Sequence, residues 1–455
     1  MRVHQAYRYA LDPTPEQERL LASHCGAARF AFNWGLARVK AAMDQRAAER
    51  SYGVADGVLT EVPWSLYSLR RAWNTAKGTI APWWAENSKE AYNTGLDGLA
   101  RALKNWAASR QGARAGKKIG FPRFKSKHRA IPSCRFTTGT IRVEADRRHV
   151  TLPRLGTIRT HESTRKLARH LERRTGRVLS ATVGRTGGRW FVAFTCEIDR
   201  AERVVAKPDA VVGVDLGIKD LAVLSTGEVI VNPKHHRSAL RRLRRLNKQL
   251  ARRVGPRTPD GARRQASARW ATTKAALGRA HARVANQRRD GLHKLTTTLA
   301  ATYGTVVVED LNVSGMLANR TLARAVADVG MAEVRRQLTY KTGWKGGELV
   351  VADRWFPSSK TCSGCGAVKA KLALSERSYT CSGCGLVLDR DLNAALNLAA
   401  LASDVAQSRG ETVNARGGAV SPVVRGRIAP AKRELPEGRT PPRQHGGSLI
   451  FTKKH

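Results

Sequence analysis

A chain of 455 residues is long enough for two to four domains, so disulfides are not needed for stability. Its 81 Lys and Arg against 36 Asp and Glu give a formal net charge of +45. This charge favours a protein that binds a polyanion such as a long nucleic acid. The alternative classes are a ribosomal-type basic protein and a protein that binds membrane surfaces. No apolar run reaches the roughly 18 residues of a membrane-spanning helix, and the first residues lack a signal peptide's apolar region, so an intracellular protein with reduced thiols is expected.

The first 111 residues are predicted to form a strand followed by a helical bundle. Residues 3–12 have a strand-like pattern, and two prolines end it. Thr14 is a suitable cap for a helix over residues 16–50, and further helices are expected over residues 64–76 and 89–108. Six of the ten tryptophans lie before residue 110. They favour the core of the bundle, with stacking on nucleobases as the alternative.

An extended basic segment follows the helices. Residues 114–129 carry seven Lys or Arg, and Pro122 prevents a continuous helix. Arg123, Lys125 and Lys127 are therefore candidate contacts to nucleic acid. Beyond this segment, residues 135–160 and 178–199 alternate polar and apolar positions around glycine-containing turns, which predicts the hairpins of a small β-barrel or sandwich.

The most basic stretch spans residues 234–294, with 19 Lys or Arg against two acids. Leucines at helical spacing predict two long helices there, broken near residues 255–261. A charge run usually forms a solvated face, but a run with this imbalance repels itself unless phosphates lie along it. The candidate nucleic-acid contacts in this stretch are Arg241, Arg242, Arg244 and Arg245.

Apolar strands surround this basic stretch. Residues 209–231 predict a buried strand, a turn and a second strand, close to a β-hairpin. Residues 305–311 and 348–352 predict further strands, with a loop and a helix between them. After about residue 402 the chain turns to Gly, Pro, Arg and Ser, and a disordered tail is expected because this composition buries little apolar surface.

Four of the seven cysteines have the spacing of a metal site. Cys362 and Cys365 form one CxxC pair, and Cys381 and Cys384 form a second after a spacer of fifteen residues. Four thiolates leave no open coordination position, so one structural zinc ion is predicted. Redox chemistry is the alternative, but it does not explain two pairs. The remaining cysteines are expected to be buried small apolar residues, and they are Cys25, Cys134 and Cys196.

Three carboxylates lie at the ends of apolar elements. Asp215 ends the strand VVGVD, Glu309 ends VVVE, and Asp391 precedes the helix LNAALNLA. If the two strands are neighbours, the three carboxylates converge and hold one or two Mg²⁺ ions, which suits phosphodiester cleavage. The alternative roles are a helix cap for Asp391, an arginine-paired residue for Glu309 and a turn residue for Asp215. Adjacent side chains of a strand point to opposite faces, so only one of Glu309 and Asp310 can face the site, and Glu309 is chosen for its longer reach. The choice of Asp391 over Asp389 is less clear-cut.

The order of these motifs resembles the TnpB family, transposon-encoded RNA-guided nucleases related to type V CRISPR effectors. The resemblance covers residues 1 to about 402 and is carried by VGVDLGIKDLAVLSTG, VVVEDLNVSGM, YKTGWKGGELVVADRWFPSSKTCSGCG and DRDLNAALNLA. It implies an α/β RNase H-like (RuvC) nuclease domain with an inserted zinc ribbon, plus an N-terminal helical bundle and a small β-barrel. The implied domains are a wedge-like β-barrel (1–12 and 112–205), a helical recognition domain (13–111), the nuclease domain (206–355 and 386–402), the zinc ribbon (356–385) and a disordered basic tail (403–455).

The resemblance also implies an activity. The chain is expected to be an RNA-guided, Mg²⁺-dependent DNA endonuclease of a mobile element, with Asp215, Glu309 and Asp391 at the family's three acid positions. Its expected partners are a guide RNA derived from the element and double-stranded target DNA, with no membrane, in the cytoplasm at a prokaryotic nucleoid. The alternatives are a non-cleaving RNA-guided DNA-binding regulator and a transposase that transfers strands.

Overall fold

The structure is a computed structural model that describes residues 1–413 except 115, 128, 202–203, 255–265 and 374, with the backbone alone for residues 403–413. The predicted break near residues 255–261 and the predicted tail beyond residue 413 lie outside the described residues. None of the described helices combines the length and the apolar character needed to cross a membrane.

A seven-stranded antiparallel sheet gathers residues from both ends of the first half of the chain. Its order is β2-β6-β7-β1-β5-β4-β3, and β1 (Arg2–Asp12) lies at the centre between β7 (Arg189–Asp199) and β5 (Gly156–Thr160). The side chains of β7 alternate between buried and more exposed, as a strand with one covered face requires. Gly187 and Gly188 both have positive φ and form the predicted turn before β7. The remaining strands are β2 (Ser133–Phe136), β3 (Arg142–Val143), β4 (His149–Leu152) and β6 (Gly176–Thr186).

The expected strands are present, and the closure of this sheet into a barrel stays a prediction. One helix was not expected, α4 (Arg165–Glu172). Its sequence RKLARHLE contains only three apolar residues, which is too short a pattern to show a helical period.

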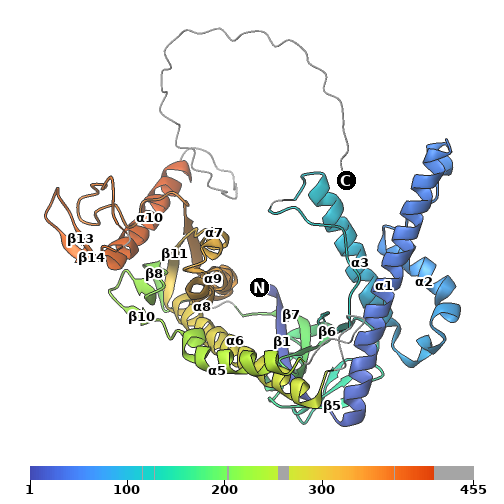
Figure 1. The fold of residues 1–455 in the computed structure, drawn as a ribbon. Coiled ribbons are helices and arrows are strands. Elements are labelled where there is room, and N and C mark those ends of the chain that lie inside the picture. The colour runs from blue at the N-terminus through green and yellow to red at the C-terminus, as the bar shows by residue number, and fades with distance from the viewer. Residues whose placement is uncertain (115, 128, 202–203, 255–265, 374, 414–455) are drawn as a thin grey trace, which may run out of the picture. The chain divides into compact units, whose positions relative to one another are not determined.

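Three helices share one apolar core with this sheet, and the first and third of them lie beside it (Figure 1). Thr14 caps α1 (Pro15–Ser51) through a capping box with Gln17, as the sequence predicts. The second helix, α2 (Leu66–Ile80), begins later than expected because Ser65 is its cap. α1 and α3 (Lys89–Arg110) approach closely at Gly95, where a Cβ would lie 2.1 Å from the carbonyl oxygen of Ala28. Two 3₁₀ turns join these helices, Asp56–Val58 and Pro82–Glu86.

The tryptophans of this bundle divide between its core and its surface. Trp73 is buried, and Trp34 and Trp84 pack partly against the core. Trp64 and Trp83 keep 40% and 37% of their surface exposed. The prediction of a mainly structural role is therefore confirmed for the first group, and base stacking stays a prediction for the second.

The second half of the chain contains a five-stranded mixed sheet. Its order is β10-β9-β8-β11-β12, in which β8 (Lys207–Asp215) and β11 (Tyr303–Glu309) pair in parallel. β12 (Glu348–Ala352) continues the parallel part, and β9 (Asp220–Leu224) is antiparallel to β8. Residues 209–231 contain three strands instead of the two expected, and the additional strand, β10 (Val229–Val231), forms the edge beside β9. The expectation that the two apolar strands are neighbours is confirmed.

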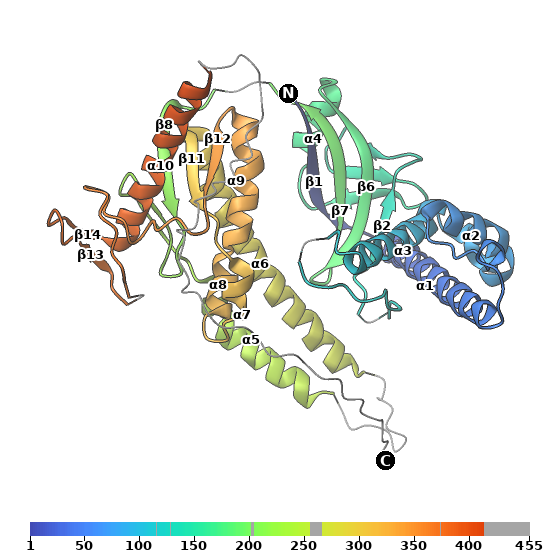
Figure 2. The ribbon, with the colours of Figure 1, turned by 90° about the horizontal axis from the view of Figure 1, so that it is seen from above.

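Helices cover both faces of this sheet (Figure 2). Val306 and Val308 of β11 pack in the core with α6 (Ala268–Thr302) and α9 (Met331–Lys345), whereas Val307 packs in the core with α10 (Arg390–Val413). Strand alternation therefore gives each face its own helices. α10 lies so close to β8 that a Cβ on Gly213 would be 2.0 Å from the carbonyl oxygen of Ala395. The backbone of α10 continues to Val413, beyond the predicted start of the tail.

The basic stretch forms two helices, as predicted, α5 (His235–Arg252) and α6, which pack along each other. Between β11 and β12 the chain forms three helices instead of the one expected. Gly330, with φ +77°, separates the second from α9. The two shorter helices are α7 (Val313–Ala318) and α8 (Ala323–Val329), and a two-stranded ribbon of β13 (Ser378–Thr380) and β14 (Val387–Asp389) precedes α10.

Candidate functional site

The three carboxylates lie on one face and at one end of the five-stranded sheet. On β8, Gly213 faces α10, so Asp215 two residues later has the same orientation. On β11, Val307 faces α10, and Glu309 follows it with the same parity. Val308 pairs with Val214, which brings Glu309 beside Asp215. Asp391, in the first turn of α10, completes the group, and all three residues line one cavity of about 1160 Å³.

The neighbour of Glu309 has a different role. Asp310 accepts hydrogen bonds from the guanidinium groups of Arg335 and Arg354, the latter at 2.7 Å. These arginines hold the pKa of Asp310 below its usual value despite the opposing effect of burial. Glu309 instead accepts a hydrogen bond from the hydroxyl of Ser358. Of the two adjacent acids, Glu309 is therefore the one that shares the cavity with Asp215.

The two aspartates at the start of α10 also differ in their roles. Asp389 Oδ1 accepts the backbone N–H groups of Asp391 at 2.9 Å and Leu392 at 3.1 Å, so Asp389 caps the helix. Asp391 itself accepts hydrogen bonds from the guanidinium of Arg390 at 3.1 and 3.2 Å, and Arg377 lies 3.8 Å from its other oxygen. The helix-cap alternative for Asp391 is thus taken by Asp389.

The electrostatics of Asp215 reflect this clustering. Burial, followed by the nearby carboxylates of Glu309 and Asp391, raises the pKa of Asp215 to about 8, and Arg390 opposes this rise. A carboxyl group whose pKa is raised by neighbouring carboxylates is stabilised in its ionised form by a bound cation. Among the described residues, only the four cysteines are gathered tightly enough to form a ready metal cluster. The carboxylates share a more open cavity, which fits an ion such as Mg²⁺ that keeps water ligands.

The wall of this cavity is basic. Cationic side chains come from the loops around the carboxylates, from the start of α5, and from α8 and α10. They are Lys219, Lys234, Arg237, Arg324, Lys360, Arg377 and Arg390. Such a wall attracts and orients a phosphodiester backbone. The cavity therefore joins a negative floor, suited to a hard cation, with a positive rim, suited to a polyanion.

The four cysteines form a compact cluster beside this cavity. Their sulfur atoms lie within 4.8 Å of one another, with Cys362 3.6 Å from Cys384 and Cys365 3.6 Å from Cys381. Tetrahedral zinc with Zn–S bonds of about 2.3 Å requires S–S separations of about 3.8 Å. A disulfide would need about 2.05 Å, so the geometry fits a metal and disfavours bonded pairs.

The two CxxC turns have the same backbone hydrogen bonds. The residue after each pair is a glycine with positive φ, Gly366 or Gly385, and its N–H donates to the first cysteine's carbonyl. Backbone N–H groups of Cys384 and Gly383 lower the pKa of Cys381, which favours its thiolate. The three single cysteines are buried, as predicted, and burial raises the pKa of each.

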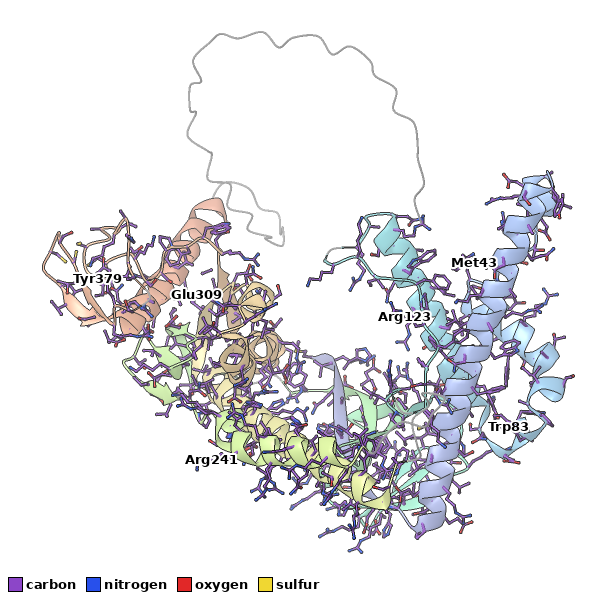
Figure 3. All side chains as sticks on the ribbon, viewed as in Figure 1. Met43, Trp83, Arg123, Arg241, Glu309 and Tyr379 are labelled. Carbon is purple, nitrogen blue, oxygen red and sulfur yellow. The ribbon has the colours of Figure 1, made fainter. Side chains whose placement is uncertain are left out.

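The predicted nucleic-acid contacts lie on two exposed regions. Arg241, Arg242, Arg244 and Arg245 are exposed on α5 around the buried Leu243, and Figure 3 marks Arg241 there. Arg123 and Lys127 are exposed on the extended segment after α3. Lys125 in the same segment is tied to α1, because its ammonium lies 3.8 Å above the Phe32 ring and its backbone bonds Asn33.

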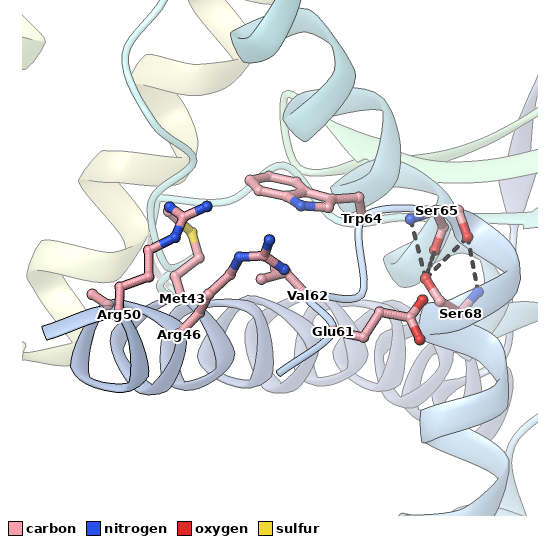
Figure 4. A pocket seen from close by; sticks show the side chains of 9 residues that line it. Met43, Arg46, Arg50, Glu61, Val62, Trp64, Ser65 and Ser68 are labelled. Carbon is pink, nitrogen blue, oxygen red and sulfur yellow. Dashed lines mark hydrogen bonds between the residues drawn. The ribbon is translucent and has the colours of Figure 1, made fainter. Parts of the chain in front are cut away.

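A second pocket, of about 640 Å³, lies between α1 and the start of α2 (Figure 4). Trp64 forms one wall and stacks on Trp106 with ring centroids 6.0 Å apart. Arg46 and Arg50 of α1 lie across from it, and Arg50 pairs with Asp56. An exposed aromatic face beside two guanidinium groups is a surface on which a nucleobase could stack.

The carboxylate site includes residues that the sequence did not single out. Ser358 contacts Glu309, and Asn393 and Asn397 of α10 hold the loop that contains Ser358. Each is a common polar residue whose partner lies 30 or more positions away, so no local pattern marks it. The one feature of the sequence that could have marked these residues is the pair of asparagines, because asparagine is uncommon inside an apolar helix.

Three family descriptions match successive parts of the chain. Residues 193–320 match "Probable transposase", residues 332–398 match "Cas12f1-like, TNB domain", and residues 1–47 match "Helix-turn-helix domain". In the structure, residues 1–47 form β1 and most of α1.

Relatives resemble the chain over most of its length. A Mycobacterium tuberculosis H37Rv protein named "Putative RNA-guided DNA endonuclease Rv2885c" is 44% identical over 414 residues, covering 87% of this chain and 86% of its own. The Escherichia coli K12 protein "Putative RNA-guided DNA endonuclease InsQ" is 30% identical over 87% of this chain and 92% of its own. A solved "Cas12f1-sgRNA-target DNA complex" chain is 12% identical, with TM-score 0.45, over 88% of this chain and 99% of its own.

At this identity and coverage the family is established. The chain belongs to the TnpB family, which confirms the resemblance found in the sequence.

Proposed function

We propose that this protein is an RNA-guided, Mg²⁺-dependent DNA endonuclease of a mobile element. The observation that carries the proposal is the shared cavity of Asp215, Glu309 and Asp391, with its cationic rim. The names of the M. tuberculosis and E. coli relatives, both "Putative RNA-guided DNA endonuclease", support the same activity. The mixed sheet with helices on both faces supports an RNase H-like (RuvC) nuclease domain around this cavity.

In the proposed mechanism, Asp215, Glu309 and Asp391 hold one or two Mg²⁺ ions. When bound, such ions would supply activation of the attacking water and stabilisation of the leaving oxygen. Arg377, beside Asp391, and Lys360, on the cavity wall, neutralise the charge of the scissile phosphate. Ser358 donates a hydrogen bond to Glu309, and Asp310 stays outside the reaction because two arginines pair with it.

The four cysteines hold one structural Zn²⁺ in this proposal. All four coordination positions would be filled by thiolates, so the zinc site has no role in cleavage. When bound, the zinc ion would hold together the ribbon that precedes α10. The remaining proposed domains are those given by the resemblance, a wedge-like β-barrel and a helical recognition domain.

The guide RNA and the target DNA would lie on the basic surfaces. The guide RNA, derived from the mobile element, would pair with one target strand, and the protein would read the heteroduplex by shape and backbone. The arginines of α5 and the segment of Arg123 and Lys127 are the proposed contacts, with Lys125 contributing less because it lies on Phe32. The proposed location of the working protein is therefore the prokaryotic nucleoid.

The direct test is cleavage of a matched DNA duplex by the protein loaded with its copurified RNA. Asp215→Ala should abolish Mg²⁺-dependent cleavage and retain RNA and DNA binding, because the carboxylate holds ions and not the duplex. Cutting by this variant at the rate of the unsubstituted protein would refute the assignment. A non-cleaving regulator would bind the target with no Mg²⁺-dependent product. A transposase would instead yield joined ends in a strand-transfer assay.

A further inference from the structure

One short loop lies between the cysteine cluster and the carboxylate cavity. It spans residues 358–363, from Ser358 to the residue after Cys362. At its first residue the Ser358 hydroxyl donates to Glu309 Oε1, and at its end Cys362 belongs to the thiol cluster. Ser358 is only 3% exposed, so water does not compete for this hydrogen bond.

Two asparagines of α10 fix this loop. Asn393 and Asn397 are four positions apart, so they lie on the same face of the helix, and their exposures are 0% and 6%. Asn397 Nδ2 donates to the carbonyl oxygens of Ser358 and Thr361, both at 2.7 Å. Asn393 Nδ2 donates to the Thr361 carbonyl at 2.7 Å, and its Oδ1 accepts the N–H of Ser363 at 3.0 Å.

These contacts define an amide clamp, Asn393 and Asn397 against residues 358–363. The clamp attaches the loop to the helix whose first turn contains Asp391. Ser358 then attaches the same loop to Glu309, on β11. One hydroxyl and two buried amides thus link two carboxylates that come from different elements.

We propose that Ser358 is a positioning residue that orients the Glu309 carboxylate for metal binding, and that the amide clamp holds Ser358 in place. The proposal rests on the proposed function, in which Glu309 is a metal ligand. A glutamate has three rotatable side-chain bonds, and a hydrogen bond to one carboxylate oxygen selects the rotamer and leaves the other oxygen free to coordinate. Removal of such an outer partner typically weakens metal binding by 10- to 100-fold.

The test measures Mn²⁺ binding to the full-length, zinc-loaded protein, from the electron paramagnetic resonance signal of free Mn²⁺. Ser358→Ala should raise the dissociation constant roughly tenfold. In a Glu309→Gln background the same substitution should have no further effect, because Ser358 acts through Glu309. The matched control is Ser378→Ala, on an exposed position of β13, which should leave the dissociation constant unchanged.

A second variant addresses the clamp. Asn397→Asp keeps the side chain's size but replaces its donor NH₂ with an oxygen that faces the carbonyls of Ser358 and Thr361. It should weaken Mn²⁺ binding at least as much as Ser358→Ala, and in RNA-loaded protein both variants should raise the Mg²⁺ concentration for half-maximal cleavage without changing target-DNA affinity.

The outcomes separate this proposal from the proposed function. If unsubstituted protein shows no Mn²⁺ binding that Asp215→Ala abolishes, the carboxylate site itself is wrong. If that binding is present but Ser358→Ala leaves it intact, the positioning role is refuted. Equal weakening by Ser358→Ala in the Glu309→Gln background would also refute it, because the effect would then be a general loss of structure.

Discussion

Gly213→Ala should displace α10 from the sheet and with it one of the three carboxylates. A Cβ at this position would lie 2.0 Å from the carbonyl oxygen of Ala395, 2.6 Å from the amide nitrogen of Ala399 and 3.0 Å from the carbonyl carbon of Ala395. An ordinary carbon–oxygen contact is roughly 3.3 Å, so α10 must move by about 1 Å, since backbone atoms have no rotamer with which to avoid the contact. Overpacking of this kind costs about 3 kcal/mol.

The shift should affect cleavage as well as stability. Asp391 lies one turn before Ala395 on the same helix, and it should move by a similar distance away from Asp215. A misplacement of about 1 Å in a catalytic group typically costs about 100-fold in rate. Cleavage of a matched duplex by RNA-loaded Gly213→Ala protein should therefore fall by about two orders of magnitude, with a lower melting temperature.

The control for this prediction is the same substitution where there is space. Gly26 lies within α1, and a Cβ there would meet no atom within 4 Å. Gly26→Ala should stabilise the protein by about 0.5–1 kcal/mol through helix propensity and leave cleavage unchanged. If Gly213→Ala melts and cleaves like the unsubstituted protein, the close packing of α10 does not position Asp391.

Three further predictions concern single side chains. Asp389→Ala should cost about 1 kcal/mol through loss of the α10 cap and retain cleavage, whereas Asp391→Ala should abolish cleavage; melting curves and duplex-cleavage rates distinguish the two. Cys381→Ser should lower the zinc content from one equivalent towards zero by elemental analysis, and a full equivalent of bound zinc would contradict the predicted site. Burial lowers the pKa of Lys341 to about 8, below its unfolded value of 10.5. The unfolded chain binds more protons between these values, so stability should rise with pH across this window, and Lys341→Met should flatten this rise in melting temperatures from pH 7 to 10.

Much of the carboxylate arrangement could be predicted from strand patterns. Apolar β-branched runs end at Asp215 and Glu309, and parallel pairing then places both at one sheet edge. The sequence could not show which face of each strand meets α10, and so it left Glu309 and Asp310 as alternatives. The structure distinguishes the two acids, because Asp310 pairs with two arginines. One of these arginines, Arg354, lies just after β12.

The features that were not predicted depend on contacts distant in sequence. The clamp joins residues 358–363 to Asn393 and Asn397. The helical period places these asparagines on one face but does not reveal which residues they contact. The extra helices between β11 and β12 are short, six and seven residues, which is below the length at which apolar spacing is informative. The contact between the Lys125 ammonium and the Phe32 ring could likewise not be predicted, because the two residues are far apart in the sequence.

The central place of β1 constrains how the chain can fold during synthesis. Arg2 pairs with Asp199, 197 residues later, so the first strand remains without its main partner until β7 has left the ribosome. At about 5–20 residues per second this wait lasts about 10–40 s, during which α1, α2 and α3 can form from local contacts. A strand left unpaired for that time is open to pairing with other chains. The yield of folded protein should therefore depend strongly on temperature and translation speed during expression, even if the folded protein itself is stable.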